Sequence, residues 1–211
     1  MNAISTVRPC ACVIMASGQS LRFGENKLIK PLCGRPLIEY IIEKISSFSE
    51  VPAVVVTRWP AIPPIAERYG IPVILHEYPL VNDTIRLGTE YFMQYKKPPL
   101  GIMYCVADQP LIRLSTLREL FEKFAGHPDS ILRLGGPGKD GKERFSNPVI
   151  FPQSVYDELC TLPQGKTGKF VIQKHSEIVE TLRTGDYAEF LDADTEQEFA
   201  EIEQNCRLQQ Y

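Results

Sequence analysis

The chain has 211 residues and a formal net charge of −3. This length suits a single domain spanning residues 1–211, since α/β domains commonly run somewhat past the modal size of about 150 residues. The slightly acidic balance excludes the basic field expected of a nucleic-acid-binding protein. Only a short apolar run precedes Ser17 and Gly18, so we expect no signal peptide, no membrane span and a cytoplasmic location.

Apolar runs rich in β-branched residues predict buried strands, and helical spacing of apolar residues predicts helices between them. In chain order, strands are expected at 12–15, 53–56, 73–75, 101–106 and 130–134, and helices at 37–45, 85–93 and 117–124. Ser115 is expected to cap the last of these helices. The alternation predicts an α/β fold, with a mostly parallel central sheet covered on both faces.

The second half of the chain changes character. Residues 135–147, "GGPGKDGKERFSN", are rich in glycine and charge, and predict a mobile loop that borders a site, before a strand at 148–151. Thr195 and Glu198 form a capping box that starts a last helix, with apolar contacts at Phe199 and Ile202. The six cysteines show no metal-ligand spacing, and we expect free thiols.

The loop after the first predicted strand is the first candidate site. Small residues at 16–18 allow a ligand to approach the backbone, and Arg22 and Lys27 follow within one short stretch. Neither the Rossmann glycine fingerprint nor the phosphate-binding lysine motif of P-loop proteins is present, which excludes a nicotinamide-dependent Rossmann enzyme. The two cations can clamp a polyphosphate; alternatively, they are solvated surface charges.

Asp108 is the second candidate. It follows the strand expected at 101–106, and the carboxyl ends of parallel strands share one edge of a sheet. A carboxylate there can hold Mg²⁺ against the phosphates of a nucleotide. Alternatively, Asp108 is a turn or helix-capping residue.

Together these residues carry a resemblance. The opening "MASGQSLRFGENKLIKPLCGRPLIEY" resembles the signature of MobA-like nucleotidyltransferases, and so do "TIRLG" at 84–88, "VADQP" at 106–110, "NPVIF" at 147–151 and "LDADTEQEFAEI" at 191–202. The resemblance covers essentially the whole chain, and its last two motifs favour the molybdenum cofactor cytidylyltransferase branch. It implies the three-layer α/β/α, Rossmann-like and GT-A-like fold of these enzymes.

The resemblance also implies a mechanism. An NTP lies over the first loop, its phosphates meet Gly18, Ser20, Arg22 and Lys27, and an acceptor phosphate attacks the α-phosphorus and expels pyrophosphate. Lys27 stabilises the phosphate charge, and Asp108 holds Mg²⁺ together with Asp194 or its neighbour Asp192. Alternatively, Asp192 and Asp194 only interact electrostatically with the N-terminal end of the last helix and bind no metal ion.

The base and acceptor contacts are less sharply indicated. In the resembling families, the residue type after Ala16 correlates with the base of the nucleotide that the enzyme uses. Ser17 at that position favours CTP. Asp83 and Thr84 either contact the nucleotide or cap a helix. Asn147 is a candidate for the acceptor, and Arg144 either binds an acceptor phosphate or is a solvated loop charge.

One segment departs from the family pattern. Where the cytidylyltransferase branch carries G-D-x-G-A-R, this chain has residues 165–170, "GKTGKF", with Lys166 at the acidic position and Phe170 at the arginine position. Lys166 and Lys169 either add phosphate affinity or lie on the surface. A reversed charge changes which anionic acceptor fits, so molybdopterin rests on overall similarity.

The sequence therefore favours a Mg²⁺-dependent nucleotidyltransferase that moves CMP from CTP to molybdopterin, with a molybdoenzyme as a possible recipient of the product. Three alternatives remain: GTP as the donor, another phosphorylated acceptor such as a sugar phosphate or phospho-alcohol, and a non-catalytic carrier of a nucleotide-modified cofactor. A carrier would keep the first loop and lose the metal carboxylates, whereas this chain has both.

Overall fold

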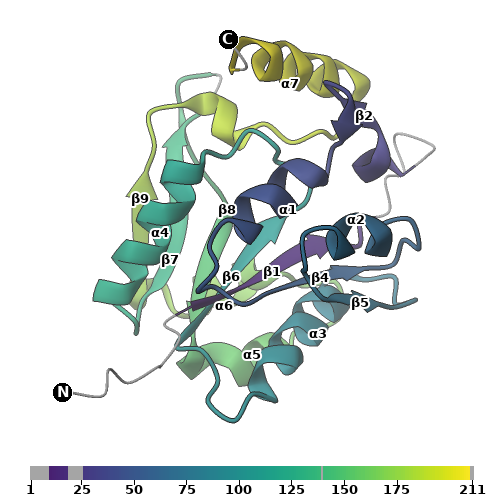
Figure 1. The fold of residues 1–211 in the computed structure, drawn as a ribbon. Coiled ribbons are helices and arrows are strands. Elements are labelled where there is room, and N and C mark those ends of the chain that lie inside the picture. Colours follow the sequence, from purple (N-terminus) through teal and green to yellow (C-terminus); the bar gives the residue numbers. More distant parts are fainter. Residues whose placement is uncertain (1–9, 19–25, 139, 210–211) are drawn as a thin grey trace, which may run out of the picture.

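The computed structural model describes residues 10–18, 26–138 and 140–209. Its centre is a seven-stranded sheet in the order β5-β4-β1-β6-β8-β7-β9 (Figure 1). All neighbouring strands in this order pair in parallel except β8, which is antiparallel to both β6 and β7. The strands are β1 (Cys10–Ala16), β4 (Ala53–Thr57), β5 (Val73–Leu75), β6 (Gly101–Val106), β7 (Ile131–Pro137), β8 (Glu143–Pro152) and β9 (Val179–Arg183).

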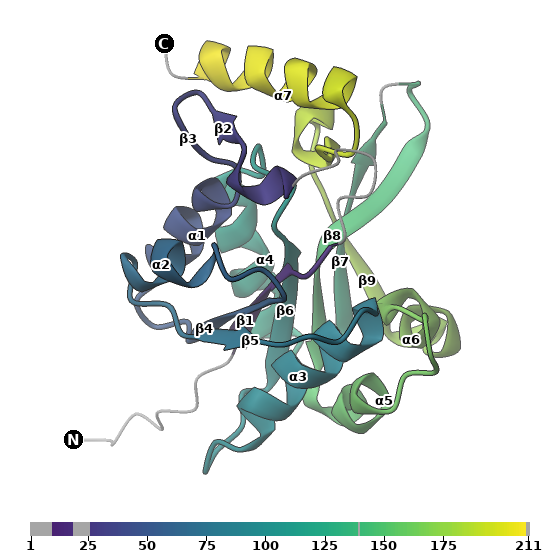
Figure 2. The same cartoon turned by 90° about the vertical axis from the view of Figure 1, so that its right-hand side faces the viewer.

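Helices cover both faces of the sheet. One core holds Ile14 of β1 with apolar residues of α1, α2, α4 and α7, and the other holds Val13 with residues of α3, α5 and α6. Figure 2 shows the two helical layers and α7 lying across the end of the molecule, beside β2 and β3. The expected three-layer, Rossmann-like α/β/α fold with a mostly parallel sheet is therefore confirmed. The helices are α1 (Glu39–Ser46), α2 (Pro63–Glu67), α3 (Val81–Met93), α4 (Leu114–Gly126), α5 (Tyr156–Cys160), α6 (Gly168–Lys174) and α7 (Glu196–Gln209).

Short elements complete the fold. β2 (Pro31–Leu32) and β3 (Arg35–Pro36) form a small separate hairpin. The described residues also form four short 3-10 helices: η1 (Lys27–Ile29), η2 (Gln153–Val155), η3 (Ser176–Ile178) and η4 (Tyr187–Phe190). The six cysteines are free thiols, as expected. None of the helices in the described part of the chain has the length and apolar character needed to cross a membrane.

The prediction of a loop over residues 135–147 is wrong. Its two ends belong to β7 and β8, which pair as a hairpin with Gly135 opposite Phe145 and Gly136 opposite Arg144. Glycine is required here for packing: a Cβ on Gly135 would lie 2.6 Å from the Thr181 methyl group, and one on Gly136 would lie 2.5 Å from the Thr184 carbonyl oxygen. The sequence rule that glycine marks a loop fails where glycine permits close strand packing.

Two capping predictions have opposite outcomes. Ser115 does not cap α4, because the helix begins at Leu114 after Arg113, which provides no side-chain cap. Thr195 does cap the last helix: its Oγ1 accepts from the Glu198 backbone N–H at 3.2 Å and donates to Glu198 Oε2 at 2.9 Å. The cap fixes the chain direction directly after Asp194.

Candidate functional site

Lys27 is the centre of the candidate site. Its side chain is 8% exposed, and its Nζ donates to Asp108 Oδ2 at 2.6 Å and to Asp194 Oδ1 at 2.7 Å. Burial by itself lowers the pKa of Lys27, but the Asp108 and Asp194 carboxylates outweigh it and raise the pKa above the ordinary value. The ammonium is therefore held charged between two carboxylates.

These three side chains come from distant parts of the sequence. Lys27 starts η1, where Asn26 Oδ1 accepts from the Leu28 backbone N–H at 3.1 Å and fixes the turn. Asp108 follows β6, the neighbour of β1 in the sheet. The Ala193 N–H donates to the Asp108 carbonyl oxygen at 3.1 Å, which ties the segment before α7 to the end of β6. Strand order and this backbone bond together assemble the site.

Asp192 is adjacent but differently engaged. Burial, followed by the charge of Asp108, raises its pKa to about 6, although a hydrogen bond from Gln109 acts in the opposite direction. Gln109 Nε2 donates to Asp192 Oδ1 at 2.7 Å and to Ser146 Oγ at 2.8 Å. Of the two aspartates considered as the second metal ligand, Asp194 contacts Lys27 and Asp192 contacts Gln109.

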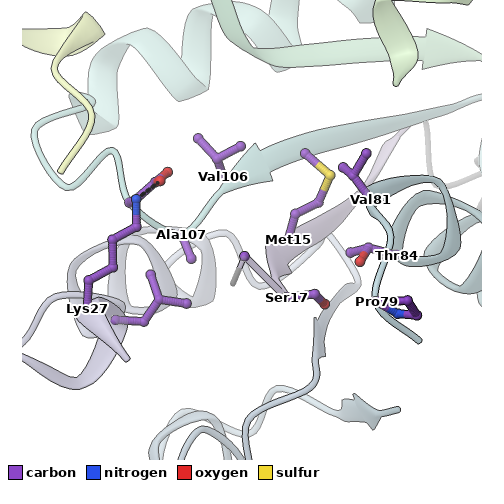
Figure 3. A pocket seen from close by; sticks show the side chains of 11 residues that line it. Met15, Ser17, Lys27, Pro79, Val81, Thr84, Val106 and Ala107 are labelled. Carbon is purple, nitrogen blue, oxygen red and sulfur yellow. Dashed lines mark hydrogen bonds and ion pairs between the residues drawn. The ribbon is translucent and has the colours of Figure 1, made fainter. Parts of the chain in front are cut away.

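A cavity of about 280 Å³ lies beside Lys27. Figure 3 shows Lys27 at one side of it and Pro79, Val81 and Thr84 at the other, with Met15 and Ser17 between them. Five predicted site residues line this cavity: Ser17, Gly18, Lys27, Thr84 and Asp108.

The other predicted nucleotide contacts lie elsewhere. Ala16 is buried and is not among the lining residues; its carbonyl oxygen accepts from Thr57 Oγ1 at 2.9 Å. Asp83 is not among the lining residues, and its carboxylate lies 3.5 Å from Arg86 in the first turns of α3. Ser20 and Arg22 lie outside the described residues.

His76 is a residue that the sequence analysis missed. Its Nε2 lies 2.8 Å from Ser17 Oγ, and Ser17 donates to the Val56 carbonyl oxygen at 3.2 Å. His76 is 8% exposed, and burial lowers its pKa, which favours the neutral ring. It directly follows β5, so its place at the carboxyl end of a strand, the criterion applied to Asp108, was the signal available.

Two further features bear on this cavity. Among the residues that the structure describes, the buried Thr84 Oγ1 and His76 Nδ1 have no hydrogen-bond partner. Trp59 Nε1 donates to the Gly18 carbonyl oxygen at 3.0 Å and so fixes the start of the first loop. Buried polar atoms are rarely left without a partner, so the unpaired Thr84 hydroxyl in the cavity wall marks a position where a ligand can bind.

A second, larger cavity of about 560 Å³ adjoins the first, and the two share Met15, Val81 and Val106 as lining residues. Asn147, predicted to contact the acceptor, lines this second cavity, whereas Arg144 does not. Lys169 lines it and Lys166 does not. Arg144 lies on β8 opposite Gly136, towards the tip of the hairpin.

The donor atoms available for a metal ion are carboxylate oxygens. Within residues 10–18, 26–138 and 140–209, no group of three or more His, Cys, Asp or Glu side chains is placed to hold one. Asp108 and Asp194 instead meet at a single ammonium, and their side chains are 22% and 50% exposed. Two accessible carboxylates at one cation position suit a hard divalent ion whose remaining ligands are phosphate oxygens and water.

Comparison with known proteins gives several matches. Bifunctional GlmU from Paramagnetospirillum magneticum is 28% identical over 138 residues, which are 62% of this chain and 29% of that protein. Bifunctional GlmU from Trichormus variabilis is 25% identical over 162 residues, 72% of this chain and 35% of that protein. The chain thus spans about a third of the length of these curated relatives.

Solved structures share the fold. The structure of Rv0371c from Mycobacterium tuberculosis H37Rv has a TM-score of 0.77 at 17% identity, covering 93% of this chain and 97% of that one. CMP:2-keto-3-deoxy-manno-octonic acid synthetase complexed with CTP has a TM-score of 0.74 at 14% identity, covering 95% and 99%. At these identities the likeness is one of fold.

The family itself is shown by a sequence model described as the MobA-like NTP transferase domain, which matches residues 12–179. The match includes the first loop, Lys27, Asp108 and all the described lining residues of the second cavity, and it covers well over half of the chain. The chain therefore belongs to the MobA-like NTP transferase domain family.

Proposed function

We propose that this protein is a nucleotidyltransferase that moves a nucleoside monophosphate from an NTP to a phosphorylated acceptor and releases pyrophosphate. The observation that carries the proposal is the charged Lys27 ammonium, 8% exposed, held between Asp108 and Asp194 beside a cavity at the carboxyl edge of the sheet. Nucleotidyl transfer depends mainly on positioning and charge neutralisation, which this arrangement provides.

The reaction needs no nucleophilic side chain. An oxygen of the acceptor phosphate forms a bond to the α-phosphorus, and the bond from the α-phosphorus to the oxygen bridging to the β-phosphorus breaks. The electron pair of that bond leaves with pyrophosphate. Lys27 neutralises negative charge on the phosphates, and Arg22, as the family signature implies, does the same from the first loop.

Asp108 and Asp194 are the proposed ligands of Mg²⁺, the expected cofactor. When bound, the ion neutralises phosphate charge and orients the oxygens of the triphosphate. In the structure, the Lys27 ammonium contacts one oxygen of each carboxylate, so a cation already occupies the position that these groups share. A carboxylate pair without such a neighbour would repel itself.

CTP is the proposed donor. Ser17 and Thr84 place hydroxyl groups in the wall of the smaller cavity, where they can read the polar edge of a base. The one hydrogen of Ser17 goes to the Val56 carbonyl oxygen, so the hydroxyl offers a ligand only an acceptor, as the exocyclic amine of cytosine requires. A structural neighbour crystallised with CTP supports this choice.

Molybdopterin is the proposed acceptor, on the strength of the family motifs at 147–151 and 191–202. Residues 165–170 depart from the cytidylyltransferase pattern, and Lys169 of this segment lines the larger cavity. Lys169 stands at the alanine position of the branch pattern, and its positive charge is compatible with a phosphorylated acceptor; the acidic position is held by Lys166, which does not line this cavity. Acceptor identity is therefore the part of the proposal that most needs a direct test.

Pyrophosphate release provides that test. The protein is incubated with Mg²⁺, each of the four NTPs in turn, and molybdopterin, a sugar phosphate or a phospho-alcohol. Release with CTP and molybdopterin supports the full proposal; release with GTP or with another acceptor corrects the substrate; no release with any pair refutes the enzyme activity.

Two variants link the activity to the site. Asp108→Ala and Lys27→Ala should each reduce turnover by about 100-fold or more, as when a preorganised electrostatic contact is removed. Lys174→Ala serves as the control, because Lys174 is exposed and pairs with Glu158 on α5. Full turnover in both site variants would locate the active site elsewhere.

A further inference from the structure

The larger cavity is strongly biased in charge. The described residues that line it include the cations Arg133 and Lys169 and no Asp or Glu side chain. The remainder is mainly apolar and aromatic, including Phe145, Phe151 and the ring of Tyr104. The Tyr104 hydroxyl is already engaged with Thr89 Oγ1 at 2.6 Å, so this ring contributes an apolar surface. The cavity thus combines an anion-attracting region with a wall suited to a flat, apolar-faced group.

Arg133 is held rigidly in this wall. It lies on β7, its Nε donates to Thr181 Oγ1 at 3.2 Å, and its Cζ lies 3.5 Å above the centre of the Phe145 ring. Ring stacking and the Thr181 bond fix the plane of the guanidinium group. A fixed guanidinium plane loses little entropy on binding an anion.

The outer nitrogens of this guanidinium are available. No carboxylate of the described chain forms a salt bridge with Arg133, in contrast to Arg113, which pairs with Asp186, and Arg183, which pairs with Glu143. Arg133 Nε makes the Thr181 bond, and neither Nη atom makes a hydrogen bond to another of the described residues. Two parallel N–H groups in a plane match two oxygens of a phosphate.

The cavity also communicates with the proposed reaction centre. It shares three lining residues with the smaller cavity. In addition, Gln109 joins Ser146 in the lining of the larger cavity to Asp192 beside the metal-ligand candidates. A group bound in the larger cavity is therefore a neighbour of a nucleotide bound in the smaller one.

We propose that the larger cavity is the acceptor subsite and that Arg133, assisted by Lys169, binds the phosphate monoester of an acceptor whose remaining part is a flat, apolar-faced ring. This rests on the proposed function for its role in the reaction, whereas the binding itself does not depend on turnover. Arg133 is the specificity-determining residue, and the aromatic wall holds the ring.

Phenyl phosphate is a suitable probe, because it joins a phosphate dianion to an aromatic ring. Its binding to the wild-type protein is measured by titration calorimetry, and CTP binding is measured in parallel. Arg133→Gln should weaken phenyl phosphate binding about tenfold or more, as expected for loss of charged hydrogen bonds, and leave the Kd for CTP unchanged. Phenol, which lacks the phosphate, should bind weakly and equally to both proteins.

Arg183→Gln is the matched control. It removes the same charge from the adjacent strand β9, at a side chain that is 67% exposed and outside the cavity lining. Lys169 is exposed, so Lys169→Gln should leave the fold intact and weaken phenyl phosphate binding severalfold. Thermal melting establishes that each variant is folded, and Arg133→Lys keeps the charge if Arg133→Gln is unstable.

The outcomes separate the two proposals. Loss of phenyl phosphate binding in Arg133→Gln but not in Arg183→Gln supports the subsite, even if no NTP and acceptor pair releases pyrophosphate. Equal weakening in both variants, unchanged binding in Arg133→Gln, or no binding of phenyl phosphate by the wild-type protein at millimolar concentration would each overturn the subsite. Pyrophosphate release alone decides the enzyme activity.

Discussion

The hydrogen bonds of Ser17 indicate which tautomer the His76 ring adopts. Ser17 has one hydroxyl hydrogen, and it is donated to the Val56 carbonyl oxygen. The 2.8 Å contact with His76 Nε2 therefore requires an N–H on Nε2, which leaves Nδ1 as an unpaired acceptor. The alternative tautomer would bury an N–H without an acceptor, and such donors are rarer in proteins than unpaired acceptors. His76 thus orients the Ser17 hydroxyl as a positioning residue.

This assignment predicts a specific kinetic effect. His76→Phe removes the donor to Ser17 and should raise the KM for CTP about tenfold, the cost of one hydrogen bond, with kcat changed less than about twofold. The ratio of CTP to UTP use should fall as the Ser17 hydroxyl becomes free to rotate. Steady-state pyrophosphate release with both nucleotides measures these quantities.

His76→Gln is the matched variant, since its side-chain amide can take the place of the Nε2 donor. It should retain most of the CTP preference. If the phenylalanine and glutamine variants lose CTP affinity to the same extent, the effect comes from packing and the positioning role is wrong.

At the scale of elements, α1 supports the segment that carries Asp108. Lys44 of α1 donates from Nζ to the Pro110 carbonyl oxygen at 2.6 Å, and burial lowers the pKa of Lys44 to about 8. The charged form is therefore less favourable in the folded chain than in the unfolded chain, where the pKa is 10.5. Between these two values the unfolded state binds more protons, so this group makes stability rise as pH increases.

Lys44→Met should remove that contribution. At pH 7 the unfolding free energy of the variant should exceed that of the wild type by on the order of 1 kcal/mol, after allowance for partial exposure of Lys44. This difference should shrink between pH 8 and pH 10.5, as Lys44 of the wild type loses its proton in both states. Urea unfolding of both proteins across this range measures the difference and cancels the titration of the tyrosines and cysteines. A difference independent of pH would contradict the lowered pKa.

The β7–β8 hairpin depends on glycine for packing. A Cβ at Gly136 would meet the Thr184 backbone at 2.5 Å and the Phe190 ring at 2.9 Å, and a backbone atom cannot move aside as a flexible side chain can. Gly136→Ala should therefore cost about 1–3 kcal/mol of unfolding free energy, measured in urea. Gly126→Ala is the control, because that Cβ at the end of α4 meets nothing within 4 Å, and it should leave stability unchanged or higher.

Other helices and strands also show where sequence patterns predict secondary structure and where they do not. Long periodic helices such as α3 and α4, and strands buried on both faces such as β1 and β6, have strong local signals and were predicted within a few residues. The helices α2, α5 and α6 have only five to seven residues, too few to show a helical period, and were missed. The strand β9 was missed for a different reason: it is only partly buried and carries no continuous apolar run.

At the scale of the molecule, the site joins parts of the chain that are far apart. Lys27 is 81 residues from Asp108 and 167 residues from Asp194. The first proximity was predictable, because the carboxyl ends of parallel strands lie at one edge of a sheet. The second depends on how α7 docks, through the buried Phe199 and Ile202 and the Ala193 to Asp108 backbone bond, and only the family resemblance indicated it.

A metal ion shared by two distant carboxylates should stabilise the whole molecule. An ion that binds only the native state, together with its nucleotide, raises the unfolding free energy, by about 2.7 kcal/mol at a concentration of 100 times the Kd. For a chain of this size that corresponds to a rise in Tm of about 5–10 °C. Mg²⁺ with CTP should produce this shift in the wild type, and EDTA should abolish both the shift and pyrophosphate release.

Asp194→Asn should lose most of the shift, because the remaining carboxylate of Asp108 gives the ion a single protein ligand. Glu196→Gln is the control: Glu196 is two residues away, is 71% exposed and pairs with Lys30, and its variant should retain the full shift. Differential scanning calorimetry with and without Mg²⁺ and CTP compares the three proteins. An equal rise in Tm for the wild type and Asp194→Asn would show that binding of the ion does not depend on Asp194. The metal site would then require a different second ligand.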